Sequence, residues 1–385
     1  MNAIKNRWRS LPPRVRSIIT TAVKAVITVG AFYLLLSHKV EAEDGRHITT
    51  FTAIREHLPE IDLAVFWRFI FLATGIKIVG IVASMYRWTL LLRGQGIVLP
   101  FWHIVGSFLI GRFLGTFLPS TVGLDGYKLY DAARFSGRAV EATAATVIEK
   151  VLGIVGIFIT FLVALPFGVS VLGEHAAKVE LVTVPLAAGV IVVFFTLLFR
   201  PALVEWVIRS VPLPARGRIE GFVGRVSKAA TAYSGHKLIL INAAFQSFVV
   251  HFTTAAMYFF TALAVGAIGA TFWQVTFAST IQIFATVISP FTIAGEGVRE
   301  IVQTLLLARH IGTSHSIMSA ALGFWAAEAL TMAGAFFLWF RKADYRPAYV
   351  IVDGEEIEGI PGENDGQAVR ADSGAAAEGA VAPGN

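Results

Sequence analysis

One stretch of the chain occurs twice, with an offset of 171 residues. Phe101-Trp102 opens the first copy and Phe272-Trp273 opens the second. Each copy closes on the pattern Pro-x-Thr-[Val/Ile]-x-x-acid-Gly-x-base, at 119–128 and at 290–299. Duplicated halves that carry polar segments broken by Pro and Gly inside an apolar chain are typical of membrane transporters.

The composition excludes a soluble globular domain. Hydrophobic residues make up 55% of the chain and charged residues only 15%, and the mean hydropathy is +0.67. These values are typical of a polytopic membrane protein. Because the chain has no cysteine, it has no disulfide, no thiolate metal site and no cysteine nucleophile. The net charge of +6 arises from bases between the apolar segments, so it indicates orientation rather than nucleic-acid binding.

The apolar segments are close to or above the roughly 20 residues that a helix needs to cross a bilayer. The predicted spans are Ile18–Leu36, Phe66–Leu92, Ala142–Pro166, Leu181–Phe199, Leu238–Val265 and Ser316–Phe340. We therefore predict an all-α polytopic membrane protein with about six to eight transmembrane helices.

Loop charges predict the orientation. Residues 37–65 hold three basic and six acidic residues, whereas residues 200–237 hold seven basic and two acidic residues. Residues 1–17 carry five bases and no acid. Because basic loops remain on the cytoplasmic side, we expect 37–65 outside, and 200–237 and both termini in the cytoplasm.

The two repeat segments fit this orientation only as re-entrant segments. If 101–118 crossed the membrane completely, the basic segment 200–237 would lie outside. We therefore predict that 101–128 dips into the membrane and returns, and that 272–299 does so from the opposite face, as an inverted copy. Irregular backbone at membrane depth is tolerated only where protein or water satisfies its polar groups, so both segments are expected to line a cavity.

The expected domain organisation has three parts. Residues 1–17 form a basic cytoplasmic N-terminus, and residues 18–340 form the transmembrane domain, with repeat segments 101–138 and 272–313. Residues 341–385 form an acidic cytoplasmic tail, in which the stretch 347–385 has eight acids and one base. We expect this tail to be disordered, because it has too few apolar residues to bury a core.

Charged groups inside a membrane are costly, so they usually line a pathway or pair with one another. We expect bases to bind a lipid phosphate and acids to balance them or carry protons; the structural alternative is that local ion pairs only hold the re-entrant turns. The candidate substrate-binding residues are Lys77, Arg112, Thr121, Asp125, Lys128, Thr292, Glu296, Arg299 and Glu300. The candidate coupling or ion-pair residues are Glu149, Lys150 and Glu328.

Four motifs in order resemble the lysylphosphatidylglycerol synthase transmembrane family, also called the flippase-like domain family. The resemblance runs from about Phe66 to Phe340, with Leu124 where the family often has a second Gly, and with Lys128 and Lys150 where it often has Arg. The motifs are Tyr86-Arg87-Trp88 with 92–96, the Pro–Gly–acid segment 117–125, Ile148-Glu149-Lys150-Val151-Leu152-Gly153, and the segment 289–300.

This resemblance implies a multi-pass integral protein of the bacterial inner membrane that moves a polar-headed, anionic or phosphate-bearing lipid between leaflets. In bifunctional members a soluble aminoacyltransferase domain follows the membrane domain. Here only 45 residues follow Phe340, so synthase activity is not expected.

We expect no catalytic residue, no cofactor and no metal, since HExxH, Walker A and Gly-x-Ser-x-Gly patterns are absent from the sequence. Membrane lipids are the expected partners, enzymes of lipid biosynthesis are candidate partners, and no nucleic-acid partner is expected. Two alternatives remain open: a membrane transferase with Asp125 or Glu296 as general base, and a non-transporting scaffold that docks enzymes through 200–237 or the acidic tail.

Overall fold

A computed structural model shows the fold of most of the chain. It describes residues 19, 22–23, 26, 29–30, 32–41, 46–117, 122–200, 202–203, 206, 216–233, 235–288, 297–328, 331–341, 348–352 and 355–359.

The described residues are mainly helical, as the sequence predicts. The longer helices are α4 (Leu63–Gly94), α5 (Phe101–Phe117), α6 (Val122–Ser136), α7 (Ala139–Gly168), α8 (Ala176–Phe199), α10 (Arg216–Thr231), α11 (Lys237–Ala264), α12 (Phe272–Ile288), α13 (Val298–Ile311) and α14 (Thr313–Glu328). The shorter elements are α3 (Thr50–His57), η1 (Leu58–Glu60), η2 (Val169–His175) and α15 (Met332–Arg341), with the strands β1 (Lys39–Glu41), β2 (His47–Thr49), β3 (Ala348–Val352) and β4 (Glu355–Gly359).

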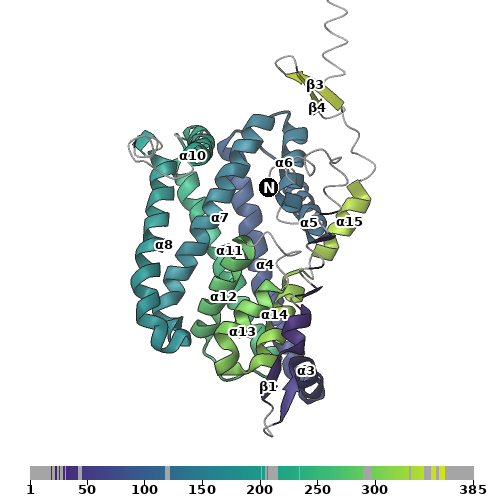
Figure 1. Cartoon of the computed structure of the whole chain (residues 1–385). Helices are drawn as coiled ribbons and strands as arrows, with labels where there is room; N and C mark the ends of the chain where they lie inside the picture. Colours follow the sequence, from purple (N-terminus) through teal and green to yellow (C-terminus); the bar gives the residue numbers. More distant parts are fainter. Residues whose placement is uncertain are drawn as a thin grey trace, which may run out of the picture.

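The long helices α4, α7, α8 and α11 run along one axis and form an elongated bundle (Figure 1). Four apolar segments are long enough to cross a membrane: Leu63–Gly94, Ala139–Phe199, Lys237–Ala264 and Thr313–Trp339. The second of these contains both α7 and α8. The chain is therefore an all-α polytopic membrane protein.

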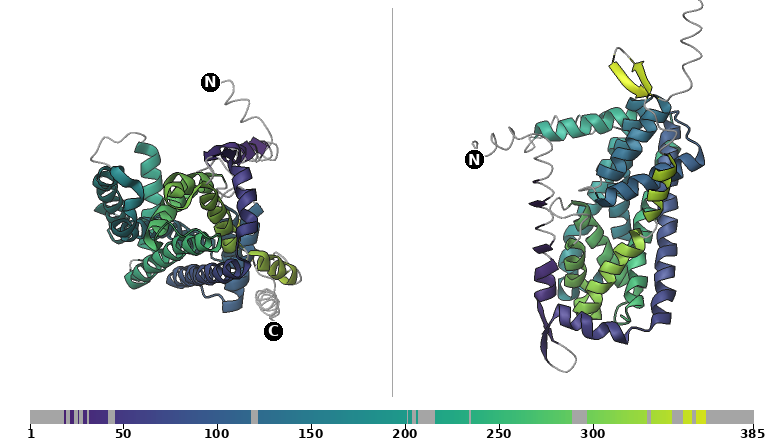
Figure 2. Two further views of the ribbon diagram at one scale, coloured as in Figure 1. Left: turned by 90° about the horizontal axis from the view of Figure 1, so that it is seen from below. Right: turned by 90° about the vertical axis from the view of Figure 1, so that its right-hand side faces the viewer.

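Two helices lie across the ends of this bundle, α3 at one end and α10 at the other (Figure 2). The basic segment 200–237 thus contains a helix that the charge count did not predict. Its apolar residues Val223, Val226 and Ala230 follow helical spacing and are buried, whereas Arg225 and Lys228 are exposed. This amphipathic pattern explains why α10 packs against the ends of α7 and α8.

Two apolar clusters form the core, one toward each end of the bundle. The cluster at the α10 end includes Trp88, Leu91 and Leu240, and the cluster at the α3 end includes Ala73 and Met257. On α4 the stretch between these clusters is mixed: it keeps buried apolar residues such as Ile81, and it also carries Lys77 and Arg87. The buried charges of α4 described below therefore lie between residues of the two clusters.

Helix α11 is held tightly against its neighbours α4 and α7. A side chain at Gly156 of α7 would place its Cβ 2.7 Å from the carbonyl oxygen of Ser247, closer than real contacts allow. Glycine therefore permits the close approach of α7 and α11, as small residues do at helix interfaces in membranes. This contact fixes the helices from which the charged side chains project.

The two sequence repeats form two helical hairpins, α5–α6 and α12–α13. Helices α5 and α12 begin and end at equivalent repeat positions and are both 17 residues long. The partners of each hairpin pack against each other, and the hairpins lie toward opposite ends of the bundle (Figure 1). This arrangement is compatible with inverted re-entrant segments, although their insertion into a membrane from opposite faces stays a prediction.

The outer parts of the chain differ from the expected plan in detail. The last predicted span, Ser316–Phe340, contains two elements, α14 and α15, and residues 329–330 between them lie outside the described residues. Within the segment expected to be a disordered tail, β3 and β4 pair as an antiparallel hairpin. The Pro–Gly breaks at 118–121 and 289–296 lie outside the described residues, as do much of the first predicted span and most of the tail.

Candidate functional site

The first charge cluster joins Arg87, Lys128 and Glu149, from α4, α6 and α7. The Nη2 atom of Arg87 lies 3.0 Å from Oε1 of Glu149, and the Nζ atom of Lys128 lies 2.7 Å from Oε2 of the same carboxylate. All three side chains are buried. Because two cations share one carboxylate, these three residues keep a net positive charge inside the bundle.

Aromatic rings and a hydroxyl group complete the surroundings of this cluster. The ammonium of Lys128 lies 4.8 Å from the ring centroid of Trp88 and 5.4 Å from that of Phe108. Arg87 also donates from Nη1 to the Oγ atom of Ser247 on α11, at 2.9 Å. Cation–π attraction and hydrogen bonding offset part of the cost of removing these charges from water.

Asp125 connects the first charge cluster to a more accessible edge. It lies one turn before Lys128 on α6, with its Oδ1 atom 3.6 Å from the Lys128 Nζ atom. Its second oxygen pairs with Lys150, whose side chain is 49% exposed. The acid of the first repeat motif therefore lies between a buried cation and a half-exposed one.

The second charge cluster contains Lys77, Arg112, Glu328, Arg299 and Glu300, and one of its ion pairs joins α5 to the end of α14. The Nη2 atom of Arg112 lies 2.7 Å from Oε1 of Glu328 and also donates to the carbonyl of Ala327 at 3.3 Å. Lys77 of α4 donates to the Oγ1 atom of Thr254 at 3.0 Å. Its ammonium interacts electrostatically with Arg112, Glu328 and Arg299, which places these four charges in one neighbourhood.

Arg299 and Glu300 stand at the start of α13. The Nη1 atom of Arg299 is 3.8 Å from Oε1 of Glu300, and the guanidinium lies 4.6 Å from the ring centroid of Phe324. The Oε2 atom of Glu300 accepts from the backbone amide of Gly297 at 2.7 Å. Gly297 has a φ of 82°, which favours glycine. The second motif therefore begins its helix with a Gly–Glu cap and a buried arginine.

A polar face of α11 joins the two charge clusters. Ser247, His251 and Thr254 follow one another at spacings of four and three residues, so they share one face. Ser247 contacts Arg87 and Thr254 contacts Lys77, as described above. Between them His251 interacts electrostatically with both of these bases and hydrogen-bonds to the backbone of Gly153. Lys77 and Arg87 are ten residues apart on α4, or about 15 Å along its axis.

The structure brings most of the predicted site residues into these two clusters. Asp125, Lys128, Glu149 and Lys150 lie in or beside the first, and Lys77, Arg112, Arg299, Glu300 and Glu328 form the second. Thr121, Thr292 and Glu296 lie outside the described residues. The bases at repeat-equivalent positions, Lys128 and Arg299, are both buried, each in a different cluster.

Sequence reasoning missed Arg87 as a site residue and treated it as an orientation charge near the end of a span. In the structure α4 extends to Gly94, and Arg87 is buried in the first charge cluster. The available signal was its spacing of ten residues from Lys77, close to three helical turns, which puts both bases on one face. Ser247 and Thr254 carried no comparable signal, because hydroxyl groups are common at helix contacts in membranes.

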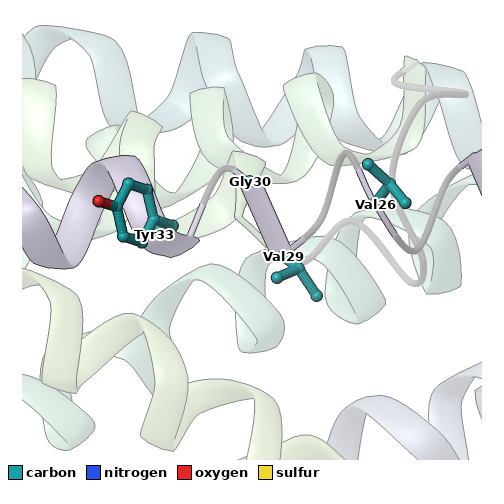
Figure 3. Close-up of a pocket in the computed structure, with 4 residues that line it drawn as sticks. All are labelled: Val26, Val29, Gly30 and Tyr33. Atoms are coloured by element: carbon teal, nitrogen blue, oxygen red, sulfur yellow. The ribbon is translucent and has the colours of Figure 1, made fainter.

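Two other features of the described residues bear on ligands. No group of three or more His, Asp or Glu side chains within the described part of the chain is placed to hold a metal ion. A shallow, almost entirely apolar hollow of about 480 Å³ is lined by Val26, Val29, Gly30 and Tyr33 (Figure 3). It lies on the N-terminal segment, away from both charge clusters, and offers contact to hydrocarbon rather than to a polar group.

Long apolar helices around a buried, charged centre define this protein as a multi-pass integral membrane protein. The family model for the lysylphosphatidylglycerol synthase TM region matches residues 15–336. The chain therefore belongs to this family, which confirms the resemblance of its four motifs. A comparison with curated proteins gives no match.

Proposed function

We propose that the protein moves a polar-headed, negatively charged lipid between the leaflets of the bacterial inner membrane. The headgroup passes through the two charge clusters while the acyl chains remain in the bilayer. The protein performs no chemistry on the headgroup in this proposal.

The observation that carries the proposal is an excess of buried positive charge. Among the residues that the structure describes, five basic side chains are buried, against three acidic ones. The basic residues are Lys77, Arg87, Lys128, Arg134 and Arg299, and the acidic ones are Asp131, Glu149 and Glu300. Uncompensated charge inside a membrane is expensive, and an anionic ligand such as a lipid phosphate supplies the missing negative charge.

The arrangement of these bases supports movement rather than fixed binding. Lys128 belongs to the hairpin toward the α10 end, and Arg299 belongs to the hairpin toward the α3 end. The polar face of α11 lies between them and contacts Arg87 and Lys77. An anion that leaves one cluster therefore finds the next bases along the axis of the bundle. This succession follows the pattern of transporter sites built from paired, broken helices near the membrane midplane.

Exposed bases favour a cytoplasmic location for the α10 end. Arg93, Arg200, Arg225, Lys228 and Lys237 are exposed there, and basic residues accumulate on the cytoplasmic side of membrane proteins. In this orientation the first charge cluster is the one nearer the inner leaflet. The headgroup would then enter from the inner leaflet at the half-exposed Asp125–Lys150 edge.

The test is a leaflet-accessibility assay in proteoliposomes with chain-labelled fluorescent phosphatidylglycerol and phosphatidylcholine. The wild type is expected to move the anionic lipid faster. K128M and R299Q are each expected to slow this movement at least about tenfold, because a desolvated phosphate loses a charged partner in either cluster. R138Q is the matched control, since Arg138 forms an exposed pair with Glu141 at the α10 end, outside both clusters.

Thermal melting and gel filtration of each purified variant establish that it is folded. Wild-type rates in a folded K128M/R299Q double variant would refute the proposal. Equal rates for both lipids in the wild type would remove the preference for negative charge. Turnover of a lipid headgroup by the purified protein would favour the membrane transferase instead.

A further inference from the structure

The second hairpin contains a group of buried polar side chains that the charge clusters do not use. Thr276, Ser279 and Gln282 lie on one face of α12, and Gln303 lies on α13; all four are at most 1% exposed. Within the described part of the chain, four of their oxygen atoms have no hydrogen-bond partner: the hydroxyl oxygens of Thr276 and Ser279 and the Oε1 atoms of both glutamines. We call these four residues the amide–hydroxyl cluster.

Contacts with α11 and α14 bring the two glutamines of this cluster together and place them beside Arg299. The hydroxyl of Tyr258 is hydrogen-bonded to Gln282, and Tyr258 interacts electrostatically with Arg299 and Glu300. Gln303 donates from Nε2 to the Oγ atom of Ser319 at 3.2 Å, and Ser319 donates to the carbonyl of Tyr258 at 3.2 Å. Both amides are therefore connected through Tyr258, next to the buried base of the second repeat.

Orphaned polar atoms in a membrane interior require an explanation, because a buried group without a partner costs free energy. The aligned positions of the first hairpin carry no polar side chain: the residues that align with Thr276, Ser279 and Gln282 are Val105, Phe108 and Gly111. The cluster is thus not a requirement of the shared hairpin fold. Its atoms are hydroxyl and amide oxygens, which accept hydrogen bonds from hydroxyl groups, and the positive charge of Arg299 beside them disfavours a cation as the partner.

We propose that Ser279, Gln282 and Gln303 form hydrogen bonds with hydroxyl groups of the headgroup while Arg299 binds the adjacent phosphate. The inference rests on the proposed function and assigns a substrate class to it: anionic lipids whose headgroup carries hydroxyl groups, of the glycerol or the sugar-like ring type. A site built to bind a hydroxyl group rejects an analogue without it, since the buried polar atoms then stay unpaired.

The test compares fluorescent lipids of equal charge in proteoliposomes. Phosphatidylglycerol carries hydroxyl groups on its headgroup, phosphatidylethanol carries none, and phosphatidylinositol carries a ring of them. The wild type is expected to move phosphatidylglycerol at least about tenfold faster than phosphatidylethanol. Faster movement of phosphatidylinositol than of phosphatidylglycerol would identify the ring type, and the opposite order the glycerol type.

Substitutions then test which residues cause the preference for phosphatidylglycerol over phosphatidylethanol. S279A removes a hydroxyl without an internal partner, so it costs the fold no hydrogen bond, and Q303M removes an amide at similar volume. In the double variant S279A/Q303M, the ratio of the phosphatidylglycerol rate to the phosphatidylethanol rate is expected to fall toward one. The phosphatidylethanol rate itself should stay within about twofold of the wild-type rate. T160V is the matched control, because Thr160 is equally buried on α7 but donates within its own helix to the Gly156 carbonyl.

The outcomes separate the two proposals. Equal wild-type rates for phosphatidylglycerol and phosphatidylethanol, or an unchanged preference in S279A/Q303M, would refute the hydroxyl subsite and leave anionic lipid transport intact. No movement of any of the three lipids would refute both. Loss of the preference in T160V as well would assign it to general packing and also refute the subsite.

Discussion

The two hairpins share a backbone plan but surround their buried bases in different ways. Helices α5 and α12 have the same length and equivalent ends, and each hairpin buries the base of its repeat motif, Lys128 or Arg299. Lys128 is paired with Glu149 from another helix and lies over two aromatic rings. Arg299 is paired with its own neighbour Glu300, near the amide–hydroxyl cluster. The first hairpin is therefore tied to the bundle by charge, and the second is embedded in neutral polar groups.

One pair of equivalent positions shows the difference between the two hairpins directly. Gly111 of α5 aligns with Gln282 of α12. A Cβ at Gly111 would lie 3.0 Å from both Cδ1 and the carbonyl oxygen of Leu124, so the first hairpin closes tightly on a glycine. At the same position the second hairpin accommodates a long amide. Duplication has kept the helices and the buried base, whereas the residues between the helices of each hairpin have changed.

The largest expected effect concerns the acids that neutralise the two bases. E149Q leaves Arg87 and Lys128 without their shared buried counter-charge, and we expect a loss of about 3–5 kcal/mol in the free energy of unfolding. E300Q should cost less, about 1–2 kcal/mol, because a glutamine oxygen can still accept from the Gly297 amide and the ion pair it removes is longer. Equilibrium unfolding in detergent measures both, and equal losses would contradict the distinction between the hairpins.

An exchange at the equivalent positions should have an intermediate effect. G111Q copies the residue of the second hairpin into the first, where Leu124 leaves no room, and a loss of about 1–3 kcal/mol is expected. G126A is the control on α6, since nothing lies within 4 Å of a Cβ there; it should be neutral or slightly stabilising. The same unfolding assay measures the effect. A G111Q variant as stable as the wild type would show that the first hairpin has room for a glutamine at this position, as the second hairpin does.

The smallest effect should come from the edge of the first charge cluster. Lys150 is half exposed, so its pair with Asp125 is screened by solvent and should contribute no more than about 1 kcal/mol. A double-mutant cycle of D125N and K150M measures this coupling energy. It should decrease further at high salt. A coupling energy of several kcal/mol that does not change with salt concentration would mean that this pair is as well shielded from solvent as the Lys128–Glu149 pair.

Much of the fold and part of the site follow from the sequence. Hydropathy predicted α4, α7, α8 and α11 to within a few residues at most ends, and the repeat predicted that Lys128 and Arg299 occupy equivalent places. Hydropathy gave no sign that the last span contains two elements, α14 and α15, because residues 326–333 are apolar apart from Glu328 and Thr331. Where a helix ends inside an apolar stretch depends on its packing neighbours more than on local composition.

The pairing within each cluster was beyond sequence reasoning. Arg112 and Glu328 are 216 residues apart, and their contact depends on how α5 and α14 are rotated about their axes. The same holds for Arg87 and Glu149, which are 62 residues apart and whose ion pair depends on how α4 and α7 face each other. Residue types showed that charges lie inside the membrane, and only the assembled helices showed which charges meet.

The two apolar clusters toward the ends of the bundle have an electrical consequence. Within the described part of the chain, a small ion travelling along the axis would meet buried apolar side chains toward either end, and the energy of an ion in such surroundings is very high. The charged residues are thus an isolated segment rather than a conducting path along the axis. In the proposed transport the headgroup enters sideways, at the Asp125–Lys150 edge, so lipid movement would not require an axial path that small ions could follow.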